Sequence, residues 1–147
     1  MAVHLIPITK SNWEIAAKLE VREDQTRFVA SNVWTIAETR WYPWTELRGI
    51  YDDGEMVGFL AYGRDPADGE FWLYRLMVDR NVQGRGFGRA GLLALIEDLR
   101  LDETCLRLTV GYEPDNVPAE QLYLSVGFVR GEPAPWGEST ANLTIQR

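Results

Sequence analysis

A glycine-rich stretch at residues 82–91 constrains the fold of this chain more than any other part of the sequence. It reads V-Q-G-R-G-F-G-R-A-G, with four glycines and two arginines, between an apolar run that ends at Val78 and another that continues to about Leu99. Because glycine has no Cβ, such a loop can turn backbone N–H groups toward a ligand, and a helix that begins there adds the positive end of its dipole. The stretch predicts a strand, an anion-binding loop and a helix, in that order.

The charge around this loop supports the same interpretation. From Arg80 to Ile96 the chain has three arginines and no acidic residue, although the whole chain carries a formal net charge of -7. A phosphate-bearing ligand is therefore the first hypothesis. A nucleic acid is not expected as a partner, because its phosphates need a basic patch larger than three loop arginines.

Alternating apolar residues before the loop predict three neighbouring strands. Residues 47–51 and 56–62 flank the turn D-D-G-E, and an Asp-Gly pair between two such runs is a strong hairpin signal. A second loop, residues 63–69, leads into a third apolar run at residues 70–78. These runs predict an antiparallel meander at the centre of a sheet.

The chain after the glycine loop predicts a helix, a strand and another helix. Residues 87–99 are apolar almost all round, which indicates a helix buried against the sheet. Residues 105–112 then form a strand, and the usual crossover makes it parallel to the strand at 70–78. Pro118 suits the first turn of a helix that Gly127 ends. The closing strands are predicted at 128–130 and 141–145.

The N-terminal part predicts an edge strand and two helices. Residues 3–8 are a short apolar run with a proline, as in an edge strand. Ser11 and Glu14 have the spacing of a capping box ahead of a helix at residues 12–20. Ser31 is suited to cap a second helix. The apolar residues that recur every fourth position on that helix are Val33, Ala37 and Trp41.

Length and composition limit the class of protein. At 147 residues, 46% of them apolar, the chain is expected to form a single domain over residues 1–147 with a core of its own. The one cysteine, Cys105, cannot form an internal disulfide, and no cluster of cysteines and histidines predicts a metal site. No apolar run approaches the roughly 20 residues that span a bilayer, so no membrane contact and a cytoplasmic location are expected.

Two familiar phosphate-binding motifs do not fit the glycines. Gly86, Gly88 and Gly91 match the G-x-G-x-x-G dinucleotide fingerprint, which requires its first glycine almost directly after a strand. Here residues 79–85 separate Gly86 from the strand, and the candidate acid Asp102 precedes the next strand instead of ending it. A Walker loop fails because no Gly-Lys-Ser/Thr follows the glycines.

A different pattern fits these residues better. Gln83, Gly86 and Gly88 have the spacing Q/R-x-x-G-x-G/A, which resembles the signature of the GCN5-related N-acetyltransferases (GNAT). The stretch N-x-x-A-x-x-L-Y-x-x-x-G-F from Asn116 to Phe128 looks like the second motif of that superfamily, in the expected order. The resemblance implies an α/β (α+β) fold with a mixed, mainly antiparallel sheet flanked by helices, and an acetyl-CoA cleft between strands 4 and 5.

The resemblance also implies roles for individual residues. Leu76, Met77 and Val78 would offer backbone groups to the pantetheine arm and the acetyl group of acetyl-CoA. The loop residues that would bind the pyrophosphate are Gln83, Gly84, Arg85, Gly86, Phe87, Gly88 and Arg89. Asn116 would contact the cofactor arm, and Tyr123 would stand near its sulfur.

Acetyl transfer to an amine needs an acid for the departing thiolate and a base for the ammonium proton. A thiol has a pKa of about 8.5 and a phenol one of about 10, so Tyr123 can donate to the thiolate and is the expected general acid. An amine with a lysine-like pKa of about 10.4 must first lose a proton. Glu113, just past the fifth strand, and Glu70, at the start of the fourth, are the candidate bases.

The chain is similar, more narrowly, to the bacterial spermine/spermidine (diamine) N-acetyltransferases, for example through V-R-E-D-Q at 21–25 and Y-E-P-D-N at 112–116. This resemblance implies a small amine as the partner, a polyamine as the favoured acceptor, and a homodimer. The candidate substrate-binding residues are Glu23, Asp24, Glu38 and Trp41, since carboxylates and aromatic faces attract ammonium groups. A protein N-terminus, a lysine and an aminoglycoside remain alternative acceptors, and a non-catalytic acyl-CoA-binding module remains the alternative from another class.

Overall fold

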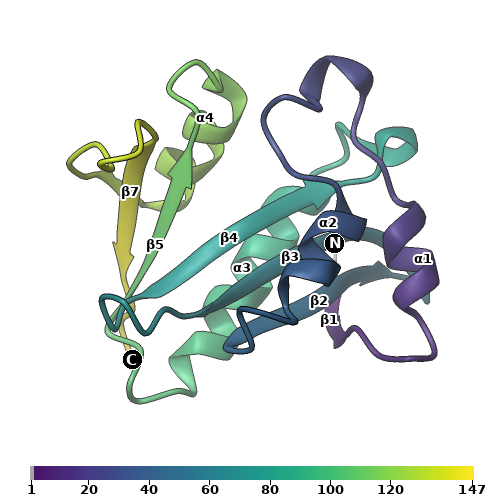
Figure 1. Cartoon of the computed structure of the whole chain (residues 1–147), viewed down its shortest axis with the longest axis horizontal. Coiled ribbons are helices and arrows are strands. Elements are labelled where there is room, and N and C mark those ends of the chain that lie inside the picture. The colour runs from purple at the N-terminus through teal and green to yellow at the C-terminus, as the bar shows by residue number, and fades with distance from the viewer. Residues whose placement is uncertain (1) are drawn as a thin grey trace.

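The apolar runs form one seven-stranded sheet in the computed structural model, which describes residues 2–147 (Figure 1). Its strands are β1 (His4–Pro7), β2 (Thr45–Asp52), β3 (Glu55–Arg64), β4 (Phe71–Val78), β5 (Arg107–Tyr112), β6 (Val129–Arg130) and β7 (Ser139–Thr144). The order across the sheet is β1-β2-β3-β4-β5-β7-β6, and every neighbouring pair is antiparallel except β4 and β5. The predicted fold class is confirmed, including the edge strand and the central meander.

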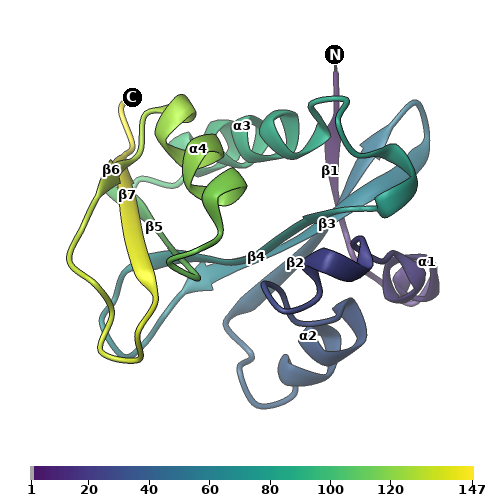
Figure 2. The ribbon, with the colours of Figure 1, turned by 90° about the horizontal axis from the view of Figure 1, so that it is seen from above.

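Four α-helices within residues 2–147 cover the two faces of this sheet. Figure 2 shows α1 (Trp13–Lys18) and α2 (Asn32–Glu38) on one face, and α3 (Phe87–Arg100) and α4 (Val117–Val126) on the other. Two short 3-10 turns, η1 (Glu23–Gln25) and η2 (Arg80–Val82), precede α2 and α3. In the part of the chain that the structure describes, no helix has the length and apolar character to cross a membrane, and no group of three or more His, Cys, Asp or Glu could hold a metal ion.

The larger core lies between the sheet and α3. Leu92 and Leu95 of α3 are fully buried and belong to the same cluster as Leu73 of β4. At Gly91 the helix lies against the sheet too closely for a side chain, because a Cβ there would lie 2.6 Å from Cδ1 of Ile50 in β2. The predicted burial of this helix is thus confirmed. A smaller core under α1 and α2 consists of Ala16, Met56, Phe59 and Met77.

The start of α1 differs from the prediction, because the capping box of Ser11 and Glu14 is not formed. Asn12 directly precedes the helix, and Oγ of Ser11 lies 2.9 Å from Oγ1 of Thr9 instead. Oδ1 of Asn12 accepts the N–H of Thr9 at 2.7 Å, and its Nδ2 donates to the carbonyl of Pro7 at 3.1 Å. The polar side chains therefore stabilise the turn before the helix, and the first N–H of the helix, that of Trp13, is bonded to the carbonyl of Thr9 at 3.0 Å instead of to a side chain.

The second helix begins where the sequence predicts but buries a different face. The side chain of Ser31 caps α2 as predicted. The expected apolar face, Val33, Ala37 and Trp41, is exposed, and the helix ends before Trp41. Asn32 and Thr35 are buried instead, and Nδ2 of Asn32 donates to the carbonyl of Ala16 in α1 at 2.9 Å. Burying an amide is unfavourable unless its polar atoms are hydrogen-bonded, and this bond offsets that cost. The contact therefore favours the side of α2 that carries Asn32 as the inward-facing side.

Candidate active site

The parallel strands β4 and β5 pair at one end only. Their ladder joins residues 71–73 to residues 108–110, whereas β4 continues to Val78 and β5 to Tyr112. Figure 1 shows the two strands diverging beyond that ladder, with α4 following β5. A cavity of about 470 Å³ lies in the gap, lined by residues of both strands. The cleft predicted between strands 4 and 5 is therefore present.

A β-bulge in β4 coincides with this divergence. The neighbours Ala61 and Tyr62 of β3 pair with Arg75 and Leu73, which leaves Tyr74 as an extra residue. A bulge places two consecutive side chains on the same side of a strand. Tyr74 and Arg75 accordingly both line a second cavity, beside α2.

The glycine loop forms a third cavity at the start of α3. Gly84 and Gly86 have φ values of +80° and +85°, in the left-handed region that glycine adopts without strain. Gly86 precedes the first residue of α3, and no side chain caps the helix there, so its first N–H groups are available to an anion. Gly84, Gly86 and Gly88 line a cavity of about 410 Å³. The side chain of Phe87 is buried in the core, whereas Arg85 is exposed.

Gln83 fixes this loop to its surroundings. Its Nε2 donates to the carbonyl of Val78 at 2.9 Å and to Oε1 of Gln25 in η1 at 2.8 Å. Arg89 reaches the neighbouring helix α4, where it donates to Oγ of Ser125 at 2.9 Å. The glutamine of the signature therefore holds the loop in place between β4 and η1, and Arg89 connects the first turn of α3 to α4.

The helix α4 carries Asn116 and Tyr123 to the same cleft. Oδ1 of Asn116 caps α4 by accepting the N–H of Ala119 at 3.4 Å. The ring of Tyr123 packs against Tyr112 and Phe128, with centroid distances of 5.7 and 5.5 Å. Both Asn116 and Tyr123 line the gap between the strands and also the glycine-loop cavity, so these two cavities adjoin.

The environment of Tyr123 favours a protonated phenol. Its side chain is only 7% exposed. Burial raises the pKa of Tyr123 above its ordinary value, and Tyr112 and Glu138 raise it further. Within residues 2–147 no hydrogen bond holds its hydroxyl. At neutral pH the group therefore keeps its proton and can donate it to a ligand.

The two candidate bases lie at opposite ends of the parallel pair. Glu113 follows β5 and lines the gap between the separated strands. Glu70 precedes β4 at the paired end, where its oxygens accept from Nε and Nη2 of Arg107 at 3.0 and 2.9 Å, and it does not line the gap. Glu138 lines the gap as well, with its Oε1 accepting from Nε1 of Trp136 at 2.5 Å. Sequence reasoning missed Glu138, because no motif marks the turn before β7.

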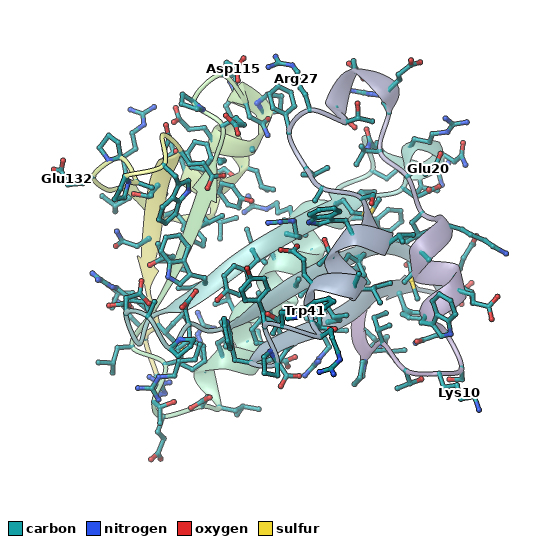
Figure 3. The ribbon with its side chains drawn as sticks, viewed as in Figure 1. Lys10, Glu20, Arg27, Trp41, Asp115 and Glu132 are labelled. Carbon is teal, nitrogen blue, oxygen red and sulfur yellow. The ribbon has the colours of Figure 1, made fainter. Side chains whose placement is uncertain are left out.

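The four predicted acceptor-binding residues do not lie together. Glu38 lines the cavity beside α2, where Nη2 of Arg75 lies 3.3 Å from its Oε1. Glu23 and Asp24 lie in η1 and border two other cavities. Trp41 follows α2, is 72% exposed, and lines none of these cavities (Figure 3). Its ring therefore faces outward, away from the space beside α2.

The cavity beside α2 adjoins the gap between β4 and β5. It has a volume of about 590 Å³ and shares Tyr74 and Arg75 with the gap. Its aromatic and acidic lining residues are Tyr42, Trp44, Tyr74, Glu38 and Asp65. The aromatic run W-Y-P-W at residues 41–44 was a signal for this cavity, but Tyr42 and Trp44 line it and Trp41 does not.

An ion pair spans the mouth of the gap. Nη1 of Arg27, in the loop before α2, lies 2.8 Å from Oδ2 of Asp115, in the loop before α4 (Figure 3). Both side chains are more than half exposed, at 64% and 61%. Such pairs contribute about 1 kcal/mol at most. The contact therefore joins the two loops without fixing them rigidly.

The geometry defines a class of α/β protein in which two parallel strands separate beside the uncapped start of a helix, an arrangement suited to an anionic ligand that extends between the strands. The acetyltransferase (GNAT) family matches this chain over residues 10–128. The chain therefore belongs to the acetyltransferase (GNAT) family, and the resemblance seen in its two motifs is confirmed.

Two relatives of known sequence are similar to most of the chain. A probable spermine N(1)-acetyltransferase of Bacillus subtilis subsp. natto (strain BEST195) is 28% identical over 134 residues, which cover 87% of this chain and 88% of the relative. The spermine/spermidine N(1)-acetyltransferase of Bacillus subtilis (strain 168) matches with the same identity and coverage. The enzyme class predicted from the motifs, an N-acetyltransferase, is thus confirmed.

Solved structures share the fold at lower identity. The aminoglycoside acetyltransferase AAC(6')-Ib in complex with coenzyme A superposes with a TM-score of 0.81 at 16% identity, covering 97% of this chain and 95% of that one. The ribosomal-protein-S18-alanine N-acetyltransferase from Escherichia coli has a TM-score of 0.72 at 21% identity, covering 99% and 95%. These likenesses show a common architecture for acetyltransferases that are named for different acceptors.

Proposed function

We propose that this chain transfers the acetyl group of acetyl-CoA to a primary amine of a polyamine. Acetyl-CoA is the cofactor, with its pyrophosphate at the uncapped start of α3 and its pantetheine arm between β4 and β5. One observation carries the proposal: the glycine-loop cavity and the gap between the strands share Leu76, Asn116 and Tyr123, so one extended ligand can occupy both. The same fold is solved with coenzyme A in a similar protein.

The free edge of β4 supplies backbone partners for the cofactor arm. Beyond Leu73, β5 no longer pairs with β4, so the backbone N–H and C=O groups of residues 74–78 that face β5 form no hydrogen bonds with that strand. Backbone N–H and C=O groups need partners when a ligand removes them from water. The two amides of a pantetheine arm meet that need in the manner of an added strand. The carbonyl of Val78 also accepts from Nε2 of Gln83 at 2.9 Å, which ties the end of the strand to the glycine loop.

The chemistry follows from the groups in the gap. The neutral amine attacks the thioester carbonyl, a C–N bond forms, and the C–S bond breaks to leave the thiolate of CoA. Tyr123 donates its proton to that thiolate, and the acylated nitrogen gives up a proton to the resulting phenolate, which restores the phenol and leaves the neutral amide. Glu113, in the same cavity, is the candidate that accepts the ammonium proton, directly or through water.

A polyamine is the favoured acceptor for two reasons. The relatives that are 28% identical over most of the chain are named for spermine and spermidine. The cavity beside α2 also combines carboxylates with aromatic rings, which suits an ammonium group. Aminoglycosides are polycations too, so an aminoglycoside is the second candidate acceptor, favoured by the structural likeness to an aminoglycoside acetyltransferase.

Release of the CoA thiol from acetyl-CoA distinguishes these acceptors. The assay compares spermidine, an aminoglycoside and a peptide with a free N-terminus, each over a range of concentrations. We expect the highest kcat/KM with spermidine. Turnover of the aminoglycoside without turnover of spermidine would contradict the polyamine proposal. Binding of acetyl-CoA in calorimetry without turnover of any amine would identify a non-catalytic acyl-CoA-binding module.

The proposal includes a homodimer that acts in the cytoplasm. The homodimer comes from the superfamily resemblance, and the cytoplasmic location from the single cysteine and the absence of a long apolar run. Light scattering after size-exclusion chromatography measures the mass in solution, and a mass near 16.8 kDa would indicate a monomer instead.

A further inference from the structure

We propose that the cavity beside α2 holds the distal ammonium of a diamine or polyamine on the carboxylate of Asp65, which makes Asp65 the residue that selects acceptors with a second positive charge. This inference rests on the proposed acetyl transfer to an amine and assigns the residue that determines which amines are used. Sequence reasoning did not mark Asp65, because it lies in the connection between β3 and β4, outside both motifs.

Asp65 is held in a fixed position but keeps room for a cation. Its Oδ2 accepts from the hydroxyl of Tyr74 at 2.9 Å, and its Oδ1 accepts the N–H of Ala67 at 2.9 Å. The hydroxyl of Tyr74 in turn accepts from Nε1 of Trp44 at 3.1 Å. Each carboxylate oxygen can accept more than one hydrogen bond. Within residues 2–147 no cation forms an ion pair with Asp65, so its charge is not neutralised.

Aromatic rings form the walls around this carboxylate. Tyr42 and Trp44 line the same cavity, and their rings meet edge to face, with centroids 5.4 Å apart and an interplanar angle of 72°. Faces of tyrosine and tryptophan rings attract ammonium groups, and the rings also cover the methylene chain between two nitrogen atoms. The site therefore suits an alkyl ammonium better than a metal ion.

The opposite end of the cavity carries positive charge. Arg75 lies where the cavity meets the gap between β4 and β5. Its Nη1 donates to the carbonyl of Tyr74 at 2.8 Å, its Nη2 pairs with Glu38 at 3.3 Å, and its buried Nε has no partner within residues 2–147. A guanidinium disfavours a second cation nearby and lowers the pKa of an adjacent amine. A diamine is thus oriented with its charged nitrogen at Asp65 and its reactive, neutral nitrogen toward the thioester.

The charges and the phenols that face the bound amine come from four segments. They are Glu38 of α2, Tyr42 of the following loop, Asp65 of the β3–β4 connection, and Tyr74 and Arg75 of β4. One arginine and two carboxylates leave the cavity with an excess of negative charge, and Glu38 is already paired with the arginine. Asp65 therefore supplies the negative charge that remains available to pair with an ammonium group of the substrate.

The test compares 1,4-diaminobutane with butylamine, which has the same chain length and no second nitrogen. We expect the wild-type enzyme to prefer the diamine in kcat/KM by at least about tenfold, the span of a charge-assisted hydrogen bond. Asp65→Asn is expected to reduce this preference to about twofold or less. The loss is expected in KM for the diamine, and it should exceed any change measured with butylamine.

Asp68→Asn is a closely matched control. Asp68 lies in the same connection and also accepts one backbone N–H, from Glu70 at 2.9 Å, and one aromatic donor, Nε1 of Trp72 at 3.0 Å. It does not line the cavity beside α2. The same chemical change at Asp68 is therefore expected to leave the preference for the diamine at its wild-type value.

The outcomes separate this inference from the proposed function. A wild-type enzyme that acetylates no amine would overturn the proposed function. A wild-type enzyme that uses both amines equally well, or an Asp65→Asn enzyme that keeps its preference, would overturn the role of Asp65 alone. If Asp65→Asn does not fold, the wild-type enzyme decides with 1,4-diaminobutane and the equally long 4-amino-1-butanol, because only the diamine carries a second positive charge for the carboxylate. Equal kcat/KM for these two substrates would equally overturn the inference.

Discussion

Replacing Tyr123 by phenylalanine removes one oxygen atom from the cleft and leaves the packing of the ring unchanged. The ring lies 5.7 Å from that of Tyr112 and 5.5 Å from that of Phe128, and phenylalanine keeps both contacts. The hydroxyl has no hydrogen bond within residues 2–147, so its removal breaks no interaction of the fold. We expect the free energy of unfolding to change by less than about 0.5 kcal/mol. In a chain of this size that corresponds to a shift in Tm of less than about 2 °C.

The rate of acetyl transfer is expected to respond far more than the stability. Without a proton donor the thiolate must leave unprotonated, and kcat should fall at least about tenfold, which is about 1.4 kcal/mol of activation free energy. Acetyl-CoA affinity should stay unchanged, because the pyrophosphate binds at the glycine loop. Since burial raises the pKa of Tyr123, the wild-type rate should not decline through ionisation of this phenol below pH of about 10. Thiol release with saturating spermidine measures kcat, and calorimetry measures the affinity.

The neighbouring tyrosine provides the control. The hydroxyl of Tyr112 donates to Oε2 of Glu120 at 2.8 Å, so Tyr112→Phe removes a hydrogen bond of the fold. This variant should lose about 1 kcal/mol of stability and keep its kcat. A Tyr123→Phe enzyme that retains the wild-type kcat would refute the assignment of Tyr123 as the general acid.

Three further experiments test the glycine loop, the packing of α3 on the sheet, and the buried thiol of Cys105. Gly86→Asp is expected to weaken acetyl-CoA binding at least about 100-fold in calorimetry, because it adds a carboxylate where the phosphates meet the start of α3. The control is Gly54→Asp, which lies at a similar φ of +78° in the β2–β3 turn and should leave the affinity for acetyl-CoA unchanged. Gly91→Val should lower the free energy of unfolding by about 1–3 kcal/mol, since its Cβ would lie 2.6 Å from Cδ1 of Ile50. The double variant Gly91→Val/Ile50→Ala should lose less stability than the sum of the two single variants, and strict additivity in denaturant melts would contradict this packing. Burial raises the pKa of Cys105 to about 11, whereas an unfolded chain has a thiol pKa of about 8.5. The protonated thiol therefore stabilises the fold fully below pH of about 8.5, and this stability is lost as the pH rises through 11. A thiol reagent at pH 8 should label the buried Cys105 only after denaturation.

The features that sequence predicted correctly depend on short stretches of chain. The hairpin turn is one of them, because Asp53 and Gly54 have φ values of 49° and 78° and Asp-Gly favours such a turn. The glycine loop is another, since the closely spaced glycines between β4 and α3 are themselves the signal, and Gly84 and Gly86 adopt the positive φ values that glycine favours. The parallel pairing of β4 with β5 follows from the crossover rule once the helix between them is identified.

The features that sequence did not predict depend on contacts between distant segments. The buried face of α2 is decided by the bond from Asn32 to the carbonyl of Ala16 at 2.9 Å, against the apolar periodicity of the helix. The network of Trp44, Tyr74 and Asp65 joins two connections and the strand β4, which only the folded sheet brings together. Helical periodicity assigned the wrong face to α2 because it contains no information about what packs against the helix.

The bulge at Tyr74 constrains how related chains can be aligned. Leu73 before the bulge and Leu76 after it pack against the same core, although an unbroken strand would carry odd and even positions on opposite sides. Removing the extra residue would leave Leu73 and Leu76 two positions apart in a regular strand, so both would still face the core. A single-residue deletion is therefore expected to be tolerated at the bulge, whereas elsewhere in β4 it would turn the residues that follow to the opposite face. A relative that lacks the bulge should accordingly align with a single gap between Leu73 and Leu76.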